Sequence, residues 1–355
     1  MNDDFTKRLL KWNIRENKRS MPWKGEKNPY KIWLSEIILQ QTRVEQGRSY
    51  YKKFIEVFPT VHHLAKASEK KIFKLWEGLG YYTRCRNLIV TAKRISREYK
   101  GEFPSSYEEI KNLKGVGPYT AAAIASFAFN LPHAVVDGNV HRVLARYFGI
   151  MTPVDTTEGK FFYAELANTL LDKKKPGIYN QAIMDFGAII CRPKNPFCEK
   201  CIQRKDCRAY QNSEVTILPV KGKAIQKKNR WFYYFIIETN DKQVYIRQRK
   251  EKDIWESLYE FVLWEPNQVI DQQEIPVSGF IQKVFNTQKF TITAISKIYK
   301  QELTHQTIKG QFITIRVNMP LAALKEYILV KKNKIKEYPF PKFITVYLQN
   351  LPHVQ

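Results

Sequence analysis

The sequence lacks the long apolar runs that a membrane protein needs. Apolar stretches such as residues 121–125 are far shorter than the ~20 residues that cross a bilayer. The chain starts with Met-Asn-Asp-Asp, which is acidic where a secretory signal is basic. We therefore expect a soluble, intracellular protein without a membrane partner.

Acidic residues are scarce relative to basic ones. The 34 Asp and Glu residues face 59 Lys and Arg residues, which leaves a formal net charge of +25. Such a surplus repels itself in a compact protein unless a polyanion neutralises it. Nucleic acid is therefore the expected partner. The alternative is a generally basic protein, because charge alone does not locate a binding face.

Cysteine is also rare, and its distribution is uneven. Four of the five cysteines, Cys191, Cys198, Cys201 and Cys207, lie within one short loop, whereas Cys85 stands alone and is expected to be a packing residue. The uneven spacing indicates a metal site and not a disulfide framework. Four thiolates can bind zinc or a [4Fe–4S] cluster. Structural zinc sites more often pair two short clips, whereas one compact loop can wrap a cluster.

Length and pattern predict two main domains, since roughly 150 residues make one domain. Residues 1–212 are almost entirely helical in pattern, and they predict an all-α domain with one core. The i, i+3, i+4, i+7 spacing of an amphipathic helix starts at Tyr30 and again at Val140. Ser105 with Glu108, or Ser106 with Glu109, has the spacing of a capping box and predicts a further helix start.

A different pattern follows residue 212. Residues 213–229 contain Pro219, Gly222 and a lysine pair without a sustained period, and they predict a basic linker. Residues 230–355 predict a smaller α+β domain. The strand-like runs are residues 231–237, 242–247, 258–264, 290–298 and 311–317, and the helix-like runs are residues 321–330 and 343–351.

Residues 113–121 have the pattern of a helix-hairpin-helix. One helix ends there, Gly115 and Gly117 permit a tight turn, and Pro118 suits the start of the next helix. Such a turn directs backbone N–H groups at a DNA phosphate without reading a base. An ordinary helix corner is the alternative if the two glycines stood alone.

Two acidic residues are candidates for chemistry. Asp137 precedes a predicted helix, where an aspartate is usually a cap, but where a negative charge is also stabilised and can stabilise a sugar cation. Glu36 lies off the apolar stripe of its helix, where most glutamates face water. The hairpin, the cysteine loop and the second acid 101 positions later favour a role in catalysis.

Together these features resemble the adenine DNA glycosylases of the helix-hairpin-helix superfamily, the MutY-type enzymes that remove adenine mispaired with 8-oxoguanine. The resemblance covers nearly the whole chain, and its most specific parts are residues 34–42, 78–82, 113–121, 137–140 and the cysteine loop. Endonuclease III-type enzymes share the hairpin, the aspartate and the cluster, but they carry a lysine nucleophile where this chain has Tyr119. A glycosylase with lyase activity and a non-catalytic DNA-binding protein are therefore the alternatives.

The resemblance implies a role for each site residue. Glu36 is the general acid that protonates adenine and later helps to activate water, and Asp137 stabilises the oxocarbenium ion, directly or through a covalent intermediate. The two roles need different environments, one that keeps Glu36 protonated and one that keeps Asp137 charged. By the same resemblance, Tyr119 and Asn139 support catalysis. Arg19, Met21 and Trp23 form the adenine pocket, with Gln181 as a weaker candidate.

The resemblance also implies contacts with DNA. Gln41 and Tyr81 would enter the duplex near the lesion after the adenine leaves the stack. The second domain resembles a Nudix fold without a pyrophosphohydrolase motif, and it would recognise 8-oxoguanine. Leu303, Thr304 and His305 stand where the family has Phe-Ser-His. We expect a [4Fe–4S] cofactor and a monomer acting in the bacterial cytoplasm, on the nucleoid, on double-stranded DNA with A:8-oxoguanine or A:G mispairs.

Overall fold

The computed structural model describes residues 2–222 and 226–351, which form two compact units. The first unit contains residues 2–67 and 86–222. The second contains residues 68–85 together with residues 226–351. No helix in the described part of the chain combines the length and the apolar character that crossing a bilayer requires.

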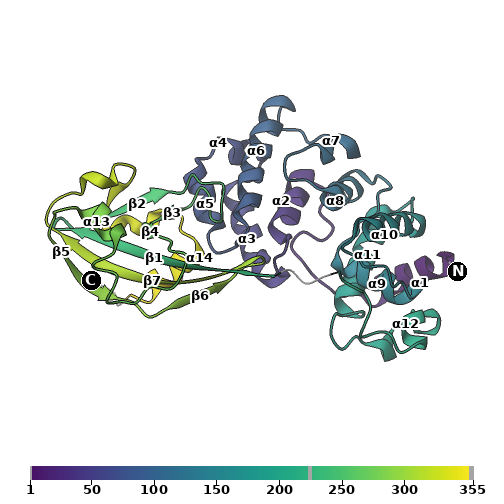
Figure 1. Ribbon diagram of the computed structural model, residues 1–355. Helices are drawn as coiled ribbons and strands as arrows, with labels where there is room; N and C mark the ends of the chain where they lie inside the picture. Colours follow the sequence, from purple (N-terminus) through teal and green to yellow (C-terminus); the bar gives the residue numbers. More distant parts are fainter. Residues whose placement is uncertain (1, 223–225, 352–355) are drawn as a thin grey trace. The chain divides into compact units, whose positions relative to one another are not determined.

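The first unit is helical (Figure 1). Its helices are α1 (Asn2–Arg15), α2 (Pro29–Leu39), α3 (Val44–Val57), α4 (Val61–Lys66), most of α6 (Tyr82–Glu98), α7 (Tyr107–Lys111), α8 (Pro118–Phe129), α9 (Gly138–Phe148), α10 (Thr157–Leu170), α11 (Pro176–Ile189) and α12 (Arg208–Gln211), with the 3-10 turns η1 (Cys198–Lys200) and η2 (Arg204–Asp206). Helices α2 and α9 confirm the two predicted helices, but only α9 is amphipathic, because α2 is buried on almost every side. The capping box is the pair Ser106 and Glu109, whose side chains are joined by a 2.6 Å hydrogen bond.

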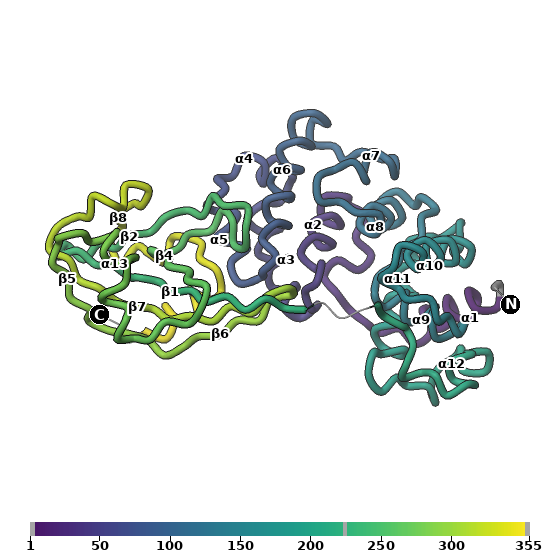
Figure 2. Tube along the Cα trace, in the orientation of Figure 1, coloured from purple at the N-terminus to yellow at the C-terminus, as the bar shows by residue number. Residues whose placement is uncertain are grey.

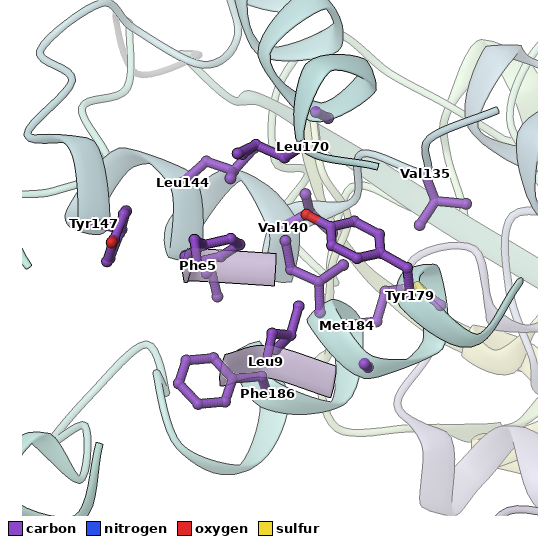
Figure 3. Packing of buried hydrophobic residues seen from close by; sticks show 14 of the residues in the cluster. Phe5, Leu9, Val135, Val140, Leu144, Tyr147, Leu170, Tyr179, Met184 and Phe186 are labelled. Carbon is purple, nitrogen blue, oxygen red and sulfur yellow. The ribbon is translucent and has the colours of Figure 1, made fainter. Parts of the chain in front are cut away.

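The core of this unit is closed by the N-terminal helix. Phe5 and Leu9 of α1 point toward Val140 and Leu144 of α9 and toward Phe186 of α11 (Figure 3). All five side chains are at most 2% exposed, and burying each one contributes roughly 1.5–3 kcal/mol. The chain that leaves α1 therefore starts beside α11, although about 160 residues separate the two elements.

Part of the predicted linker packs onto the helical unit. Leu218 is buried in its core, and the N–H of Val154 donates a 3.1 Å hydrogen bond to the carbonyl oxygen of Val220. Lys228 already opens the first strand. Residues 213–222 contain no helix or strand, but they have tertiary contacts with the helical unit.

The second unit contains one mixed sheet of eight strands in the part of the chain that is described. The elements are α5 (Glu69–Trp76), β1 (Lys228–Thr239), β2 (Gln243–Gln248), β3 (Tyr259–Glu260), β4 (Val262–Trp264), α13 (Gly279–Phe285), β5 (Phe290–Ile295), β6 (Tyr299–Glu302), β7 (Gln306–Val317), η3 (Ala322–Leu324), β8 (Ile328–Lys331), η4 (Lys332–Glu337) and α14 (Lys342–Gln349). The long strands β1 and β7 are parallel in a register from Lys228 opposite Gln306 to Thr239 opposite Val317, and every other pairing is antiparallel among these strands.

The predicted helix at residues 321–330 is wrong. That segment contains η3 and then β8, which pairs with β2. The run 258–264 divides into β3 and β4, and the sequence analysis missed β6 and α13. The helix at 343–351 is confirmed by α14, with its last residue at 349.

Alternating side chains cover the two faces of the sheet, as the period of a strand requires. Tyr233 and Phe235 of β1 pack with Ile281 and Phe285 of α13. The neighbouring residue Tyr234 stacks against Phe312 of β7 and also contacts α14. The course of the chain through these elements can be followed in Figure 2. Both faces of the sheet are therefore used for packing.

Residues 68–85 belong to this unit although they lie far away in the sequence. The ammonium group of Lys74 donates a 3.2 Å hydrogen bond to the carbonyl oxygen of Tyr338, and the N–H of Phe340 donates a 2.9 Å hydrogen bond to the carboxylate of Glu77. Lys70 also lies 3.6 Å from the centre of the Tyr338 ring. Helix α5 is thereby attached to the segment between β8 and α14.

Candidate active site

A cavity of about 680 Å³ lies within the first unit, between α1, α2, α8, α9 and α11. Its size is typical of a site for a small ligand or a single base. It gathers nine of the residues that the sequence predicted: Arg19, Met21, Trp23, Glu36, Gln41, Tyr119, Asp137, Asn139 and Gln181. The cavity brings the catalytic candidates and the adenine-pocket candidates to one place.

Glu36 is buried on α2, so it does not simply face water. Its residue is 7% exposed, and seven other residues of this helix are also buried. The pKa of Glu36 is raised to about 7: burial raises it most, a hydrogen bond from Tyr119 lowers it, and the charge of Asp137 adds to the rise. This carboxyl group can therefore hold a proton near neutral pH.

Asp137 has a polar environment at the start of α9. One carboxylate oxygen accepts 2.8 Å hydrogen bonds from the N–H groups of Asn139 and Val140, and the other accepts a 2.7 Å bond from the side-chain amide of Asn139. The positive end of the helix favours a negative charge at this place. Asp137 is thus a helix cap and also a charged wall of the cavity.

Tyr119 interacts electrostatically with both acids. Burial raises the pKa of Tyr119 well above 10, and the charges of Glu36 and Asp137 raise it further. Its hydroxyl oxygen also lies 3.6 Å from the sulfur of Met184. The phenol therefore stays neutral and adjusts Glu36 through its hydrogen bond.

Asp185 on α11 is a functional candidate that the sequence analysis missed. Its side chain is 0% exposed, and it forms ion pairs with Arg19 at 2.8 Å and with Lys24 at 2.9 Å. It also accepts hydrogen bonds from Gln181 at 3.0 Å and from Asn17 at 2.8 Å. Its position within the apolar run from Ala182 to Gly187 was a signal of burial, but it did not reveal these partners.

The hairpin turn joins α7 to α8 as predicted. Gly115 has a φ of 79°, which a residue with a side chain rarely adopts, and an added Cβ would lie 2.6 Å from Asn87. Gly117 has an ordinary φ of −91°, so of the two glycines it is Gly115 that uses the left-handed conformation. Gly117 instead leaves the helix start open, because no atom of the described residues lies within 4 Å of an added Cβ.

The second unit brings two other predicted residues together. Leu303, Thr304 and His305 form the turn between β6 and β7, and the hydroxyl oxygen of Thr304 lies 2.8 Å from that of Tyr81. Tyr81 is 47% exposed. His305 is exposed, and its carbonyl oxygen accepts a hydrogen bond from the N–H of Lys228.

The four cysteines of the loop lie close to one another. Burial is the largest cause that raises the pKa of Cys201 to about 12, and the neighbouring Cys191, Cys207 and Cys198 contribute to this rise. Among the described side chains, no group of three or more converges so as to hold a single metal ion. Cys85 is fully buried, which confirms its packing role.

A buried arginine connects this loop to the cavity. Arg142 donates hydrogen bonds to the carbonyl oxygens of Cys191 at 2.6 Å and Gly138 at 3.0 Å, and to the side-chain oxygen of Asn139 at 2.8 Å. Asn139 in turn holds Asp137. The sequence analysis did not predict this role for Arg142.

Comparison with known proteins identifies the family. Residues 34–161 match the HhH-GPD superfamily base excision DNA repair protein family, and residues 233–350 match the NUDIX domain. An adenine DNA glycosylase of Buchnera aphidicola subsp. Baizongia pistaciae is 36% identical over 88% of this chain and 86% of its own length. The chain belongs to the adenine DNA glycosylase family. It is therefore a DNA-binding hydrolase of N-glycosidic bonds that acts in base excision repair.

Other relatives agree with this assignment. The human adenine DNA glycosylase is 40% identical over 61% of this chain and 41% of its own length. A thermostable thymine-DNA glycosylase structure has a TM-score of 0.55 and 33% identity, and the match covers 59% of this chain and 97% of that one. An endonuclease III–DNA complex has a TM-score of 0.52 at 20% identity over 60% of this chain and 98% of that one, which shows the fold alone. The predicted fold class, a helical glycosylase domain plus a Nudix-like α+β domain, is confirmed.

Proposed function

We propose that this enzyme hydrolyses the N-glycosidic bond of adenine mispaired with 8-oxoguanine, or with guanine, and leaves an abasic site in double-stranded DNA. The observation that carries the proposal is the pair Glu36 and Asp137. The two acids line one cavity but have opposite environments, since burial raises the pKa of Glu36 to about 7 whereas three donors hold the Asp137 carboxylate. Glycoside cleavage uses two carboxyl groups in just these two roles.

The reaction divides between the two acids. Glu36 gives its proton to a ring nitrogen of adenine, and the bonding electrons of the glycosidic bond leave with the base. The charge of Asp137 stabilises the sugar cation that remains. Glu36, now a carboxylate, takes a proton from the water that attacks the anomeric carbon, so its starting state is restored.

The residues of the cavity favour hydrolysis without strand cleavage. A lyase needs a free lysine amine, and the lysines of the described cavity wall are Lys24 and Lys27. Lys24 is paired with Asp185, and Lys27 donates to the carbonyl oxygen of Phe127 at 3.0 Å. Tyr119 stands where endonuclease III-type enzymes carry their lysine. We therefore propose a monofunctional glycosylase.

Gln41 and Tyr81 are proposed to enter the duplex when the adenine is extruded. Both residues are exposed, and both have a left-handed backbone, with φ values of 55° and 49°. Such a conformation costs of order 1–3 kcal/mol for a residue other than glycine and concentrates at functional positions. It supports a role in which the side chain is presented to DNA and not packed.

Recognition of the oxidised base is proposed for the turn between β6 and β7. Thr304 supplies a hydroxyl group there and His305 an exposed imidazole, and the hydrogen bond between Thr304 and Tyr81 attaches this turn to the residue proposed to enter the duplex. Leu303 replaces the family's aromatic residue, so the polar groups carry the recognition in this chain.

The hairpin is proposed to bind a DNA phosphate. Helix α8 starts at Pro118, and its N-cap residue Gly117 supplies no side-chain cap, so the first N–H groups of the helix can face an anion. The φ of Gly115 permits the turn, and the open space at Gly117 permits close approach of the DNA backbone.

The donor set of the cysteine loop, four thiols on one compact segment, supports a [4Fe–4S] cluster. Cys191, Cys198, Cys201 and Cys207 would hold the cluster, and the cluster would fix the basic loop for contact with phosphate. Arg146, which lies 3.5 Å from the sulfur of Cys191, would offset the negative charge of the thiolates.

Base release under single-turnover conditions tests the proposal. Wild-type protein should release adenine from an A:8-oxoguanine duplex, whereas thymine opposite guanine and an oxidised pyrimidine should remain. Glu36→Gln should lower the rate by roughly 10²–10⁴ without weakening duplex binding. Glu45→Gln, an exposed change in the first turn of α3, is the matched control and should keep the wild-type rate. Near-normal excision by Glu36→Gln would contradict the assignment, and strand cleavage without alkali would revive the lyase alternative.

A further inference from the structure

Asp185 has no role in the chemistry described above, yet it is the most highly connected acid near the cavity. Its carboxylate is fully buried and accepts four side-chain hydrogen bonds, two on each oxygen. Asp185 is not among the residues that line the cavity, whereas Arg19, Lys24 and Gln181 are. Any effect of Asp185 on the substrate must therefore act through these three side chains.

The contact with Gln181 fixes the orientation of its amide. A carboxylate can only accept hydrogen bonds, so the group that Gln181 turns to Asp185 must be its NH2 group, 3.0 Å away. The carbonyl oxygen of Gln181 is then left for the cavity. That oxygen can accept a hydrogen bond from a base that carries an amino group, but not from one that carries a carbonyl group at the same edge.

The two cations are fixed in the same way. Arg19 and Lys24 are each 25% exposed at the side chain, and both are attached to Asp185. Lys24 also donates to the backbone carbonyl oxygen of Arg19 at 2.9 Å. The cavity therefore presents donors from Arg19 and an acceptor from Gln181. Both side chains are held by hydrogen bonds to the one buried carboxylate of Asp185.

We propose that Asp185 is a positioning residue that sets the hydrogen-bond polarity of the base pocket, so that the pocket accepts a 6-aminopurine and discriminates against a 6-oxopurine. The proposal rests on the proposed function, because it assumes that the extruded adenine occupies this cavity. Asp185 itself does not touch the base. It selects the base by holding the acceptor of Gln181 and the donor of Arg19 in one arrangement.

The test compares three bases opposite 8-oxoguanine: adenine, which carries a 6-amino group, hypoxanthine, which carries a 6-oxo group, and unsubstituted purine, which carries neither. For each duplex, the single-turnover rate of a variant is divided by the wild-type rate, which removes the different leaving-group abilities. Asp185→Asn keeps the shape but gives Gln181 no obligatory acceptor, so its amide can turn over. We expect the rate on adenine to fall about tenfold more than the rates on purine and hypoxanthine, as the loss of one hydrogen bond implies.

A compensating variant and a control make the test specific. In the double variant Gln181→Glu with Asp185→Asn, the carboxylate introduced at position 181 can accept from the amide introduced at position 185 and still offer an oxygen to the cavity, with no change in total charge. It should regain most of the preference for adenine. Asn180→Ser removes a fully buried polar side chain of the same helix that holds Val135 and His133, and it should lower all three rates by one common factor.

The outcomes separate the two proposals. If wild-type protein releases no adenine from the A:8-oxoguanine duplex, the proposed function fails. If wild type is active but Asp185→Asn lowers all three rates equally, as Asn180→Ser does, Asp185 only stabilises the fold and the inference is overturned. Thermal unfolding of each variant shows that the compared proteins are folded at the assay temperature.

Discussion

The pH dependence of base release tests the central claim about Glu36. Because the pKa of Glu36 is raised to about 7 and the acid must start protonated, the single-turnover rate should fall as pH rises through 7. With that pKa, about 90% of the enzyme is protonated at pH 6 and about 9% at pH 8, a tenfold loss of rate. An unshifted glutamate, with a pKa of 4.5, would be protonated in only about 0.3% of molecules at pH 7.

The variant Tyr119→Phe shows whether this limb belongs to Glu36. The hydrogen bond from Tyr119 lowers the pKa of Glu36, so its removal should move the descending limb to higher pH. The assay is a series of single-turnover rates on an A:8-oxoguanine duplex from pH 5 to 9, at constant ionic strength because DNA binding depends on salt. A limb centred near pH 4.5, or one that stays in place in Tyr119→Phe, would refute the reasoning.

Three further outcomes follow from the structure. The pKa of Glu36 is higher in the folded protein than in the unfolded chain, so the wild-type protein loses stability as pH rises from about 4.5 to 7. The free energy of unfolding of Glu36→Gln, measured by urea denaturation, should therefore exceed that of wild type by up to about 3 kcal/mol above pH 7 and be about equal to it below pH 4.5. Tyr81→Phe and Thr304→Val should each reduce the preference for A:8-oxoguanine over A:G, and the double variant should lose about as much as Thr304→Val alone because the two hydroxyls share one hydrogen bond; additive losses would contradict this. Wild-type protein should contain about four iron atoms per chain by chemical analysis, Cys198→Ser should lose them and Cys85→Ala should keep them, whereas bound zinc in the wild type would exclude the cluster.

Local patterns predicted the elements whose signals are contained in a few neighbouring residues. The helix at Tyr30, the cap at Ser106 and the turn at Gly115 are examples, because spacing, a side-chain cap and a left-handed φ are all local properties. The run at residues 321–330 failed because its apolar residues also suit a strand, and the pairing of β8 with β2 that decides the outcome joins residues about 85 positions apart.

The sequence predicted the two acids of the candidate site, but not the buried residues that hold the side chains around them in place. Glu36 and Asp137 are recognisable because their sequence surroundings are distinctive. Asp185 and Arg142 depend on contacts between distant segments, such as the 2.8 Å ion pair of Asp185 with Arg19 over 166 positions. Charged residues within apolar helical runs are the signal that could have identified both, since a charge is rarely buried without a partner.

The attachment of residues 68–85 to the C-terminal unit has a consequence for shortened forms of this enzyme. A chain ending at residue 222 would keep both acids proposed to act in catalysis, but Lys74 and Glu77 would lose their contacts with Tyr338 and Phe340, and Tyr81 would lose Thr304. Such a truncation would therefore remove more than lesion recognition. It would also loosen the loop that carries the side chain proposed to replace the departed adenine.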